Sequence, residues 1–214
     1  AAALPIRCCW VTNMRWRKIS CPLIPNMKLY TLTEMGQRLY SSKYGKVAKM
    51  SEAEKVVAEH DNLSHGYGIL SSAEVLRQSS QFDSVSTNRK NNTVHLRNGV
   101  EYIPDIVCKK GNQVYYVEYE MGTHTQTDFN NKCGKMLLAS KKLYFVVPNQ
   151  EILKDIMIPK MEKWIKSKNK EILSGVKIYL TTALNLAQCN FSNDSTWRIY
   201  YDINKGNSPQ GIGI

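Results

Sequence analysis

Hydrophobic and polar positions change their spacing along the chain, and these changes predict an ordered series of strands and helices. Between residues 82 and 121, short β-rich runs alternate with paired turn residues, namely Asn91-Asn92, Asn98-Gly99 and Gly111-Asn112. The pattern predicts a three-stranded antiparallel meander whose strands cover about 82–90, 93–108 (interrupted near Asn98-Gly99) and 113–121.

Two capping boxes predict helices before this meander. Ser51 and Glu54 have the required spacing and predict a helix of about three turns that ends near His60. Ser71 and Glu74 repeat the pattern and predict a second helix over roughly 72–80.

Helices and buried strands alternate after the meander. One apolar stripe predicts a helix over 123–140 and consists of Phe129, Cys133, Met136 and Leu137. A continuous apolar run predicts a buried strand over 142–149. An amphipathic pattern predicts a helix over 150–169, which Pro159 bends or splits. Two further strands are expected at 176–182 and 197–203, followed by a frayed glycine-rich end.

The order of these elements predicts an α/β (α+β) domain with a mixed sheet flanked by helices. At the amino end, a strand at Lys28–Leu32 leads into a short helix that Thr33 caps. A strand and helix in this order resemble the end of a winged-helix unit, and an ordinary αβ appendage is the alternative. We therefore divide the chain into a winged-helix-like segment (1–48), a main domain (49–200) and a flexible tail (201–214).

The charge of the chain favours a polyanionic partner. The sequence has 29 Lys and Arg against 18 Asp and Glu, a formal net charge of +11. Nucleic acid is the most common partner of such a protein, although many basic proteins bind nothing acidic. Residues 1–33 contain no acidic residue, so we name Arg15, Arg17 and Lys18 as candidate DNA contacts.

Several classes of protein are disfavoured by the sequence. No apolar run approaches the ~18–20 residues that span a bilayer, and the amino end lacks the pattern of a signal peptide. The six cysteines form no CxxC pair and no zinc-type cluster, which predicts a reducing, cytoplasmic compartment without disulfides or structural zinc. The chain has no GxxxxGK loop, which argues against a nucleotide-driven motor.

Strand geometry brings three carboxylates to one patch of the meander. Glu118 and Glu120 are two residues apart and point to the same face. A two-residue turn at Gly111-Asn112 would set Asp105 directly opposite Glu118. Carboxylates that close repel one another unless a cation intervenes, and their oxygens suit Mg²⁺ or Mn²⁺. The alternative is a solvated face on which lysines pair with the carboxylates.

The segment IPDIVCKKGNQVYYVEYEMG, residues 103–122, resembles the core of the PD-(D/E)xK nuclease superfamily. In that family a Pro-Asp and, one hairpin later, an acidic-x-Lys strand form a divalent-metal site on a restriction-endonuclease-like αβββαβ core. With its continuation GTHTQTDFNNKCGKM, the segment also resembles replication-relaxation and mobilisation-type proteins of bacterial mobile elements, in which a winged-helix part comes first. The resemblance covers roughly residues 28–147.

The resemblance implies roles for individual residues. Asp105 and Glu118 would hold the metal, with the carbonyl of Tyr119 as a further ligand. Glu120 stands where the family has its lysine, and two readings are open. Either glutamate serves at this position, or Lys132 from the next helix supplies the ammonium. The alternative for Lys132 is a surface lysine whose stem covers the core.

Other polar residues have weaker assignments. Gln126 would orient a phosphate or a water, and Lys135 would contact DNA. The family's first helix often supplies an acid, for which Glu74 is the nearest candidate, although its capping box already explains it. His124 follows the strand of the metal site and would contact a phosphate. The remaining histidines, His60, His65 and His95, have no assigned role.

Residues and resemblance together predict Mg²⁺- or Mn²⁺-dependent hydrolysis of DNA phosphodiester bonds. The first alternative is a catalytically inactive DNA-binding module in plasmid replication control or conjugative transfer. The second is an interaction domain of a larger conjugation or replication protein. Many nucleases of this fold dimerise, so a homodimer is compatible with the first reading.

Overall fold

The structure is a computed structural model that describes residues 16–20, 28–32, 34–45, 55–56, 59–60, 62–97, 99–188, 191, 196–197, 199–202 and 210–211. Its main sheet contains β3 (Ser84–Ser86), β6 (Ile106–Lys110), β7 (Gln113–Tyr119), β8 (Lys142–Val147), β9 (Lys177–Thr182), β10 (Ile199–Asp202) and β11 (Gln210–Gly211). The helices are α1 (Glu34–Tyr44), α3 (Leu63–Gln78), α4 (Arg89–Asn92), α5 (Gln126–Ala139), the π-helix η1 (Ile152–Met157), α6 (Ile158–Lys166) and α7 (Ala183–Gln188).

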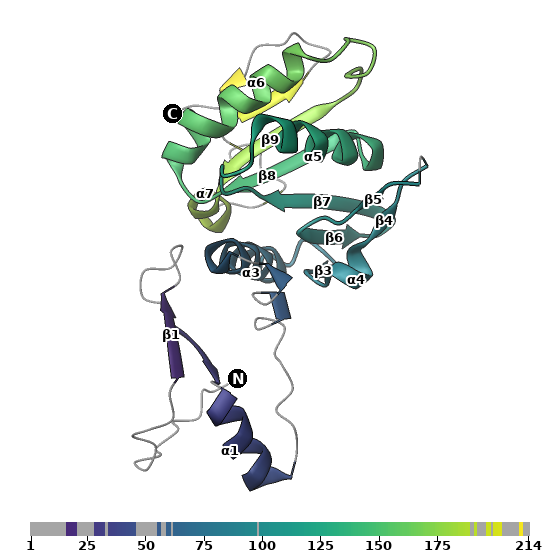
Figure 1. Ribbon diagram of the computed structural model, residues 1–214. Helices are drawn as coiled ribbons and strands as arrows, with labels where there is room; N and C mark the ends of the chain where they lie inside the picture. Colours follow the sequence, from purple (N-terminus) through teal and green to yellow (C-terminus); the bar gives the residue numbers. More distant parts are fainter. Residues whose placement is uncertain are drawn as a thin grey trace.

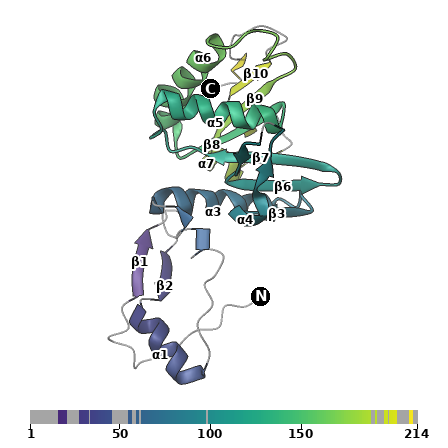
Figure 2. The same cartoon turned by 45° about the vertical axis from the view of Figure 1, so that its right-hand side comes forward.

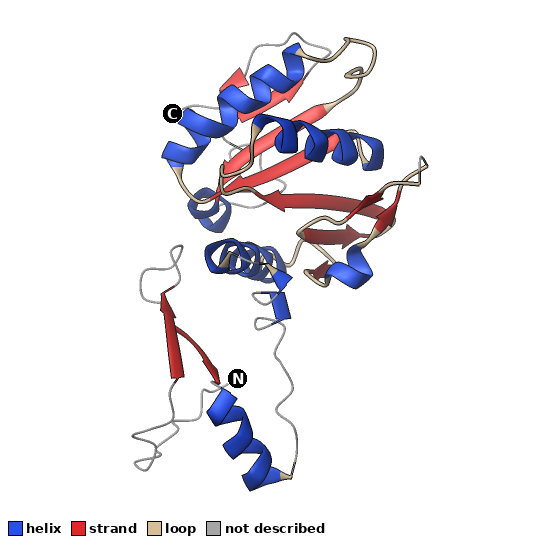
Figure 3. Cartoon of the chain, viewed as in Figure 1, coloured by secondary structure: helices blue, strands red, loops and turns tan. Residues whose placement is uncertain are grey.

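The main sheet is mixed, and helices cover both of its faces (Figures 1 and 3). Its described strands follow the order β11-β10-β9-β8-β7-β6-β3. The central pairs β7–β8 and β8–β9 are parallel, and the outer pairs are antiparallel. Each parallel pair needs a crossover connection, which α5 provides for the first and η1 with α6 for the second. Helices α3 and α7 pack on the opposite face.

Alternation along β7 divides its side chains between two cores. Val117 and Tyr119 pack in the core under α3 and α7. Glu118 lies between them in sequence and points to the other face, where Phe129 and Phe145 belong to the core under α5. This alternation places Glu118 beneath α5 while it remains almost completely buried, with 1% of its surface exposed.

The predicted fold class is confirmed. The elements α3, β3, β6, β7, α5 and β8 occur in the expected αβββαβ order, which is consistent with a restriction-endonuclease-like fold. The register of the central hairpin is also confirmed, because Lys110 pairs with Gln113 across the turn. Gly111 adopts a φ of +54° in this turn, a conformation that glycine reaches without strain.

The second predicted strand, 93–108, is interrupted near Asn98-Gly99 as expected, but the segment does not otherwise form one strand. It divides into β6 and a separate two-stranded hairpin of β4 (Val94–His95) and β5 (Glu101–Tyr102). The predicted turn at Asn91-Asn92 is instead the end of α4. The reason is Asn88, whose side chain accepts a hydrogen bond from the backbone of Asn91 and caps this short helix.

The helix predicted to begin at the Ser71 capping box is also misplaced. Helix α3 begins at Leu63, because the side chain of Asn62 accepts hydrogen bonds from the backbone of Ser64 and His65. Ser71 lies inside the helix, and its hydroxyl donates to the carbonyl of Tyr67. The start at Asn62 adds two turns to the expected helix, and these turns pack on the sheet.

Pro159 splits the helix predicted over 150–169, as expected. Residues Ile152–Met157 form η1, and α6 follows with Pro159 in its first turn. A proline lacks a backbone N–H and is tolerated in the first turn of a helix, so the helix restarts there. The amphipathic pattern also holds, because Met161, Trp164 and Ile165 are buried.

The amino-terminal elements lie apart from the sheet in both views (Figures 1 and 2). The predicted strand and helix are present, and β2 (Lys28–Leu32) pairs with β1 (Trp16–Ser20) to form an antiparallel hairpin. The cap at Thr33, the capping box at 51–54 and Arg15 lie outside the described residues. Strand β10 extends to Asp202, and β11 pairs with it, so part of the tail predicted as frayed belongs to the sheet.

The described helices and cysteines bear on two further expectations. None of these helices combines the length and apolar character needed to cross a bilayer. Within the described segments, Cys108 and Cys133 are free thiols, and both are buried.

Gly68 permits the close packing of α3 on β7, and its replacement tests this contact. A Cβ atom at position 68 would lie 2.0 Å from the ring of Tyr119. We expect Gly68→Ala to lower the free energy of unfolding by about 1–3 kcal/mol, the usual cost of overpacking, in urea denaturation. Gly134 in α5 is the matched control, because a Cβ there meets nothing within 4 Å. Gly134→Ala should raise stability by about 0.5–1 kcal/mol. Equal effects at both positions would contradict this account.

Candidate active site

A pocket of about 410 Å³ opens beside the carboxyl half of β7. It lies between the β4–β5 hairpin, the start of β6 and helix α5. The residues that line it are Arg89, Glu101, Tyr102, Ile103, Asp105, Glu118, His124, Asp128, Asn131, Lys132 and Lys135. The pocket therefore joins two of the predicted acidic residues with the predicted lysine.

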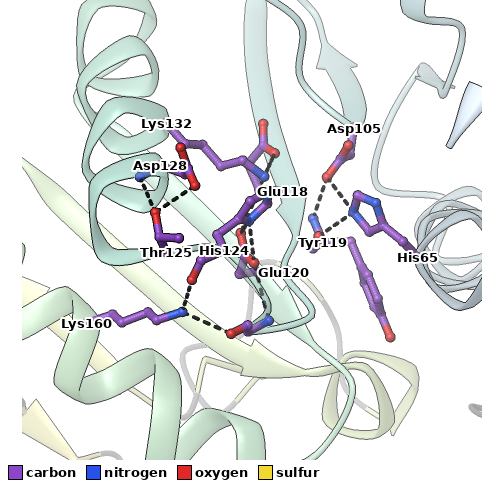
Figure 4. A network of polar contacts seen from close by, with 11 residues as sticks. His65, Asp105, Glu118, Tyr119, Glu120, His124, Thr125, Asp128, Lys132 and Lys160 are labelled. Atoms are coloured by element: carbon purple, nitrogen blue, oxygen red, sulfur yellow. Dashed lines mark hydrogen bonds and ion pairs between the residues drawn. The ribbon is translucent and has the colours of Figure 1, made fainter. Parts of the chain in front are cut away.

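The ammonium of Lys132 lies at the centre of this acidic group (Figure 4). Its Nζ is 3.0 Å from Oε2 of Glu118 and 3.4 Å from Oε2 of Glu120. Both glutamates are almost completely buried, and Lys132 reaches them from the second turn of α5. Lys132 therefore supplies the positive charge that two buried carboxylates need.

Asp105 is fixed by the backbone of β7 and by a histidine of α3 (Figure 4). The hairpin register ends with Ile106 opposite Val117, so Asp105 is the next residue, at the level of Glu118. The backbone N–H of Tyr119 donates to Oδ2 of Asp105 over 3.0 Å. Nε2 of His65 is 3.5 Å from the same oxygen and 2.8 Å from the carbonyl of Tyr119.

Two further side chains orient the glutamates. The hydroxyl of Tyr102 donates to Oε1 of Glu118 over 2.6 Å, and this tyrosine is itself buried. Nδ1 of His124 lies 2.8 and 2.9 Å from the two oxygens of Glu120. Each glutamate therefore has Lys132 on one side and a second polar partner on the other.

The loop that carries His124 is held by helix α6. Lys160 donates to the carbonyls of Gly122 and His124, the first over 2.9 Å (Figure 4). Gly122 has a φ of +78°, and a Cβ there would lie 3.2 Å from Ile152 and Ile156. A glycine is therefore required where the chain leaves β7 for α5.

Burial and charge move the pKa values of the acidic residues in opposite directions. Burial raises the pKa of Glu118 to about 7; Lys132 lowers it, and the negative charge of Asp105 raises it further. Burial also acts to raise the pKa of Asp105, yet the hydrogen bond from His65 and the charge of Lys132 hold it well below its ordinary value. Asp105 is thus the permanent anion, and Glu118 is protonated more readily.

The remaining site groups stay charged for a shared reason. Burial alone would lower the pKa of Lys132, but the charges of Glu118, Asp105 and Glu120 raise it above its ordinary value. Burial alone would raise the pKa of Glu120, but His124 and Lys132 lower it. The ammonium of Lys132 therefore remains protonated at neutral pH.

The donor atoms that line the pocket fit a hard divalent cation. Asp105 and Glu118 present carboxylate oxygens to one open volume, and Mg²⁺ is usually held by one or two carboxylates with water and substrate phosphate. The repulsion that raises the pKa of Glu118 is the kind that a bound cation removes. Asp105 and Glu118 are the residues that would hold it.

The structure brings together several of the residues named from the sequence, His124 among them, because it contacts Glu120 and lines the pocket. Asp105, Glu118, Glu120 and Lys132 form one cluster, and Lys135 lies on the rim of its pocket. The sequence-based role of Gln126 is not supported, because its amide donates to Asn130 and to the carbonyl of Lys160, which links α5 to α6.

Three other candidates lie away from the pocket. Glu74 is exposed on α3 and forms its contacts with Arg77 and Gln78 of the same helix. Arg17 and Lys18 belong to β1 in the amino-terminal hairpin, and that hairpin is separate from the main sheet.

Sequence reasoning missed two residues of the site, His65 and Tyr102. His65 comes from the third residue of α3, and recognition of Asn62 as the helix cap would have placed it in the first turn, toward the sheet. Tyr102 belongs to the β4–β5 hairpin, whose turn the Asn98-Gly99 signal predicted, but no local pattern shows that its hydroxyl reaches Glu118.

The chain matches no protein-family model, and no curated protein sequence is similar to it. Among solved structures, it is similar to the small subunit of the heterodimeric restriction endonuclease R.BspD6I. The two chains are 12% identical, the match covers 72% of this chain and 80% of that subunit, and the TM-score is 0.36. This likeness is weak, so functional conclusions depend on the geometry of the site.

Removal of the central cation should destabilise the protein. Lys132→Met leaves two buried carboxylates without their positive partner, which costs about 3–5 kcal/mol when a buried pair is broken. We expect this loss in urea unfolding at pH 8 and a smaller one at pH 5, where protonation of Glu118 relieves it. The control is Lys135→Met, an exposed lysine of the same helix, which should change stability by less than about 0.5 kcal/mol.

The raised pKa of Glu118 predicts a specific pH dependence. Glu118 has a pKa of about 7 in the folded protein against an ordinary value of 4.5, so the folded state holds its proton longer. This contribution is fully present below about pH 4.5 and is lost as the pH rises through 7. The stability of Glu118→Gln relative to wild type should therefore rise across this interval. A stability difference for Glu118→Gln that stays constant across this interval would refute the assignment.

Proposed function

We propose that this protein is an endonuclease of the PD-(D/E)xK type that hydrolyses phosphodiester bonds of DNA with Mg²⁺ or Mn²⁺. The observation that carries the proposal is the position of Lys132. Its ammonium contacts the acidic strand of β7 at Glu118 and Glu120, although it comes from the following helix. A lysine from α5 thus supplies the charge that the resemblance places on the strand, where this chain has Glu120.

The metal would be held by Asp105 and Glu118. When bound, it would polarise the scissile phosphate and lower the pKa of a water molecule. Asp105 is suited to this role because the contacts of His65 and Lys132 keep its pKa low, so it remains ionised at any working pH. Glu118 is oriented by the hydroxyl of Tyr102, which fixes one oxygen and aligns the carboxylate with the pocket.

Lys132 would stabilise the charge that develops on the phosphate. Its ammonium lines the pocket, and its raised pKa keeps it protonated, so it acts as a fixed positive charge and not as a base. Such preorganised charge in a poorly solvated site is an effective form of transition-state stabilisation.

Glu120 and His124 would together accept the proton of the attacking water. Glu120 holds Nδ1 of His124, and His124 lines the pocket. A carboxylate in this position fixes the tautomer of the ring, which leaves Nε2 as the atom that exchanges a proton with the pocket. Glu120 then acts as a positioning residue, which accounts for a glutamate at the expected lysine position.

The surroundings of the pocket suit a nucleic-acid backbone. Arg89 and Lys135 lie on its rim, and the chain carries a net charge of +11. Phosphate contacts by such groups release counterions, so the affinity for DNA should fall steeply with salt. A homodimer would allow both strands to be cut.

A second candidate is a DNA-binding module without catalysis, in plasmid replication control or conjugative transfer. One observation favours it. Lys132 already contacts both glutamates, and Glu120 occupies the expected lysine position, so part of the negative charge that a metal would neutralise is already neutralised by the protein. The resemblance to mobilisation-type proteins of mobile elements supports this biological setting.

Nicking of supercoiled plasmid DNA at low salt separates the two candidates. We expect metal-dependent conversion to the open-circular form by wild type and none by Asp105→Ala. His124→Ala should slow nicking by about a hundredfold or more, the usual contribution of a positioned acid or base. Glu171→Gln removes an exposed acid outside the pocket and should cleave like wild type.

Two results would count against the nuclease. Cleavage that persists in Asp105→Ala would point to a contaminating enzyme or to another site. Salt-sensitive DNA binding without cleavage under either metal would favour the binding module.

A further inference from the structure

A second group of potential ligands lies on the other side of Asp105, away from Lys132. It consists of His60, His65 and Asp105, whose potential ligand atoms all lie within 4.8 Å of one another. His60 precedes α3, and His65 lies in its first turn. The two imidazole rings meet edge to face with centroids 4.7 Å apart. Two histidines and a carboxylate from distant parts of the chain thus converge on one point.

The spacing around His65 matches an octahedral coordination shell. With metal–ligand bonds of about 2.1 Å, neighbouring ligand atoms in such a shell are about 3.0 Å apart. Nε2 of His65 lies 2.8 Å from the carbonyl oxygen of Tyr119 and 3.5 Å from Oδ2 of Asp105 (Figure 4). Nε2 of His65 can therefore occupy a position adjacent to each of the two oxygens on one ion.

His60 would complete the set after a small movement. Opposite ligands in the same shell lie about 4.2 Å apart, and the potential ligand atoms of this cluster lie within 4.8 Å of one another. His60 is partly buried and stands in a bend before α3, where its side chain can approach the ion without any change in the sheet.

We propose that His60, His65 and Asp105, with the carbonyl of Tyr119, bind a transition-metal ion such as Mn²⁺ in preference to Mg²⁺. Imidazole nitrogen is a good ligand for first-row transition metals, whereas Mg²⁺ prefers oxygen ligands and retained water. The inference rests on the proposed function, because Asp105 belongs to both sites. It adds a nitrogen-ligated position on the α3 side, beside the pocket of Glu118 and Lys132.

The test is pulsed electron paramagnetic resonance of Mn²⁺ bound to the full chain. Imidazole ligands give a ¹⁴N modulation that oxygen ligands do not. We expect this modulation in wild type and its loss in the His60→Ala/His65→Ala double variant. It should persist in His95→Ala, the matched control, because His95 is exposed and lies on the β4–β5 hairpin. It should also persist in Glu118→Gln, which alters only the pocket side.

Titration calorimetry gives a second readout. His65→Ala should weaken Mn²⁺ binding by about tenfold or more and change Mg²⁺ binding much less. Mn²⁺ binding without ¹⁴N modulation in wild type would overturn the proposal, as would the absence of Mn²⁺ binding. The wild-type spectrum does not depend on whether the variants fold.

The outcome is separable from that of the plasmid assay. Nitrogen-ligated Mn²⁺ without any nicking would sustain this site and refute the nuclease. Metal-dependent nicking with only oxygen ligation of Mn²⁺ would refute this site and sustain the nuclease.

Discussion

The neutralisation of buried glutamates by Lys132 is the constraint on which the site depends. Glu118 and Glu120 leave water because alternation along β7 directs them under α5, and each would be costly there alone. Contacts with Lys132, the hydroxyl of Tyr102 and the imidazole of His124 compensate for the loss of hydration. Because these partners come from α5, β5 and the loop after β7, the site exists only when those elements are docked. Stability and function therefore share the same contacts.

Both faces of one strand serve the site in different ways. The side chains of Glu118 and Glu120 belong to the α5 face, whereas the ring of Tyr119 packs against Gly68 on the α3 face. The backbone of Tyr119 passes between them and contacts Asp105 and His65. The packing of the Tyr119 ring on Gly68 therefore positions the backbone of Tyr119, which contacts both Asp105 and His65.

Sequence reasoning succeeded where a short-range rule decides the outcome. A two-residue turn at Gly111 fixes the register and hence the level of Asp105, and helical periodicity places Lys132 beside the buried stripe of α5. It failed where two local signals compete. The capping box at Ser71 predicted the start of α3, but Asn62 caps the helix, and the added turns pack on the sheet. The partners of Gln126 and Tyr102 are set by tertiary contacts, which no local pattern encodes.

Lys160 gives helix α6 influence over a pocket that it does not line. It holds the carbonyls of Gly122 and His124, and the side chains of η1 close over Gly122. A small molecule bound between α6 and this loop would displace His124 without entering the pocket that Asp105, Glu118 and Lys132 line. Against the proposed nuclease, such a compound would act non-competitively, so a higher concentration of DNA would not relieve the inhibition.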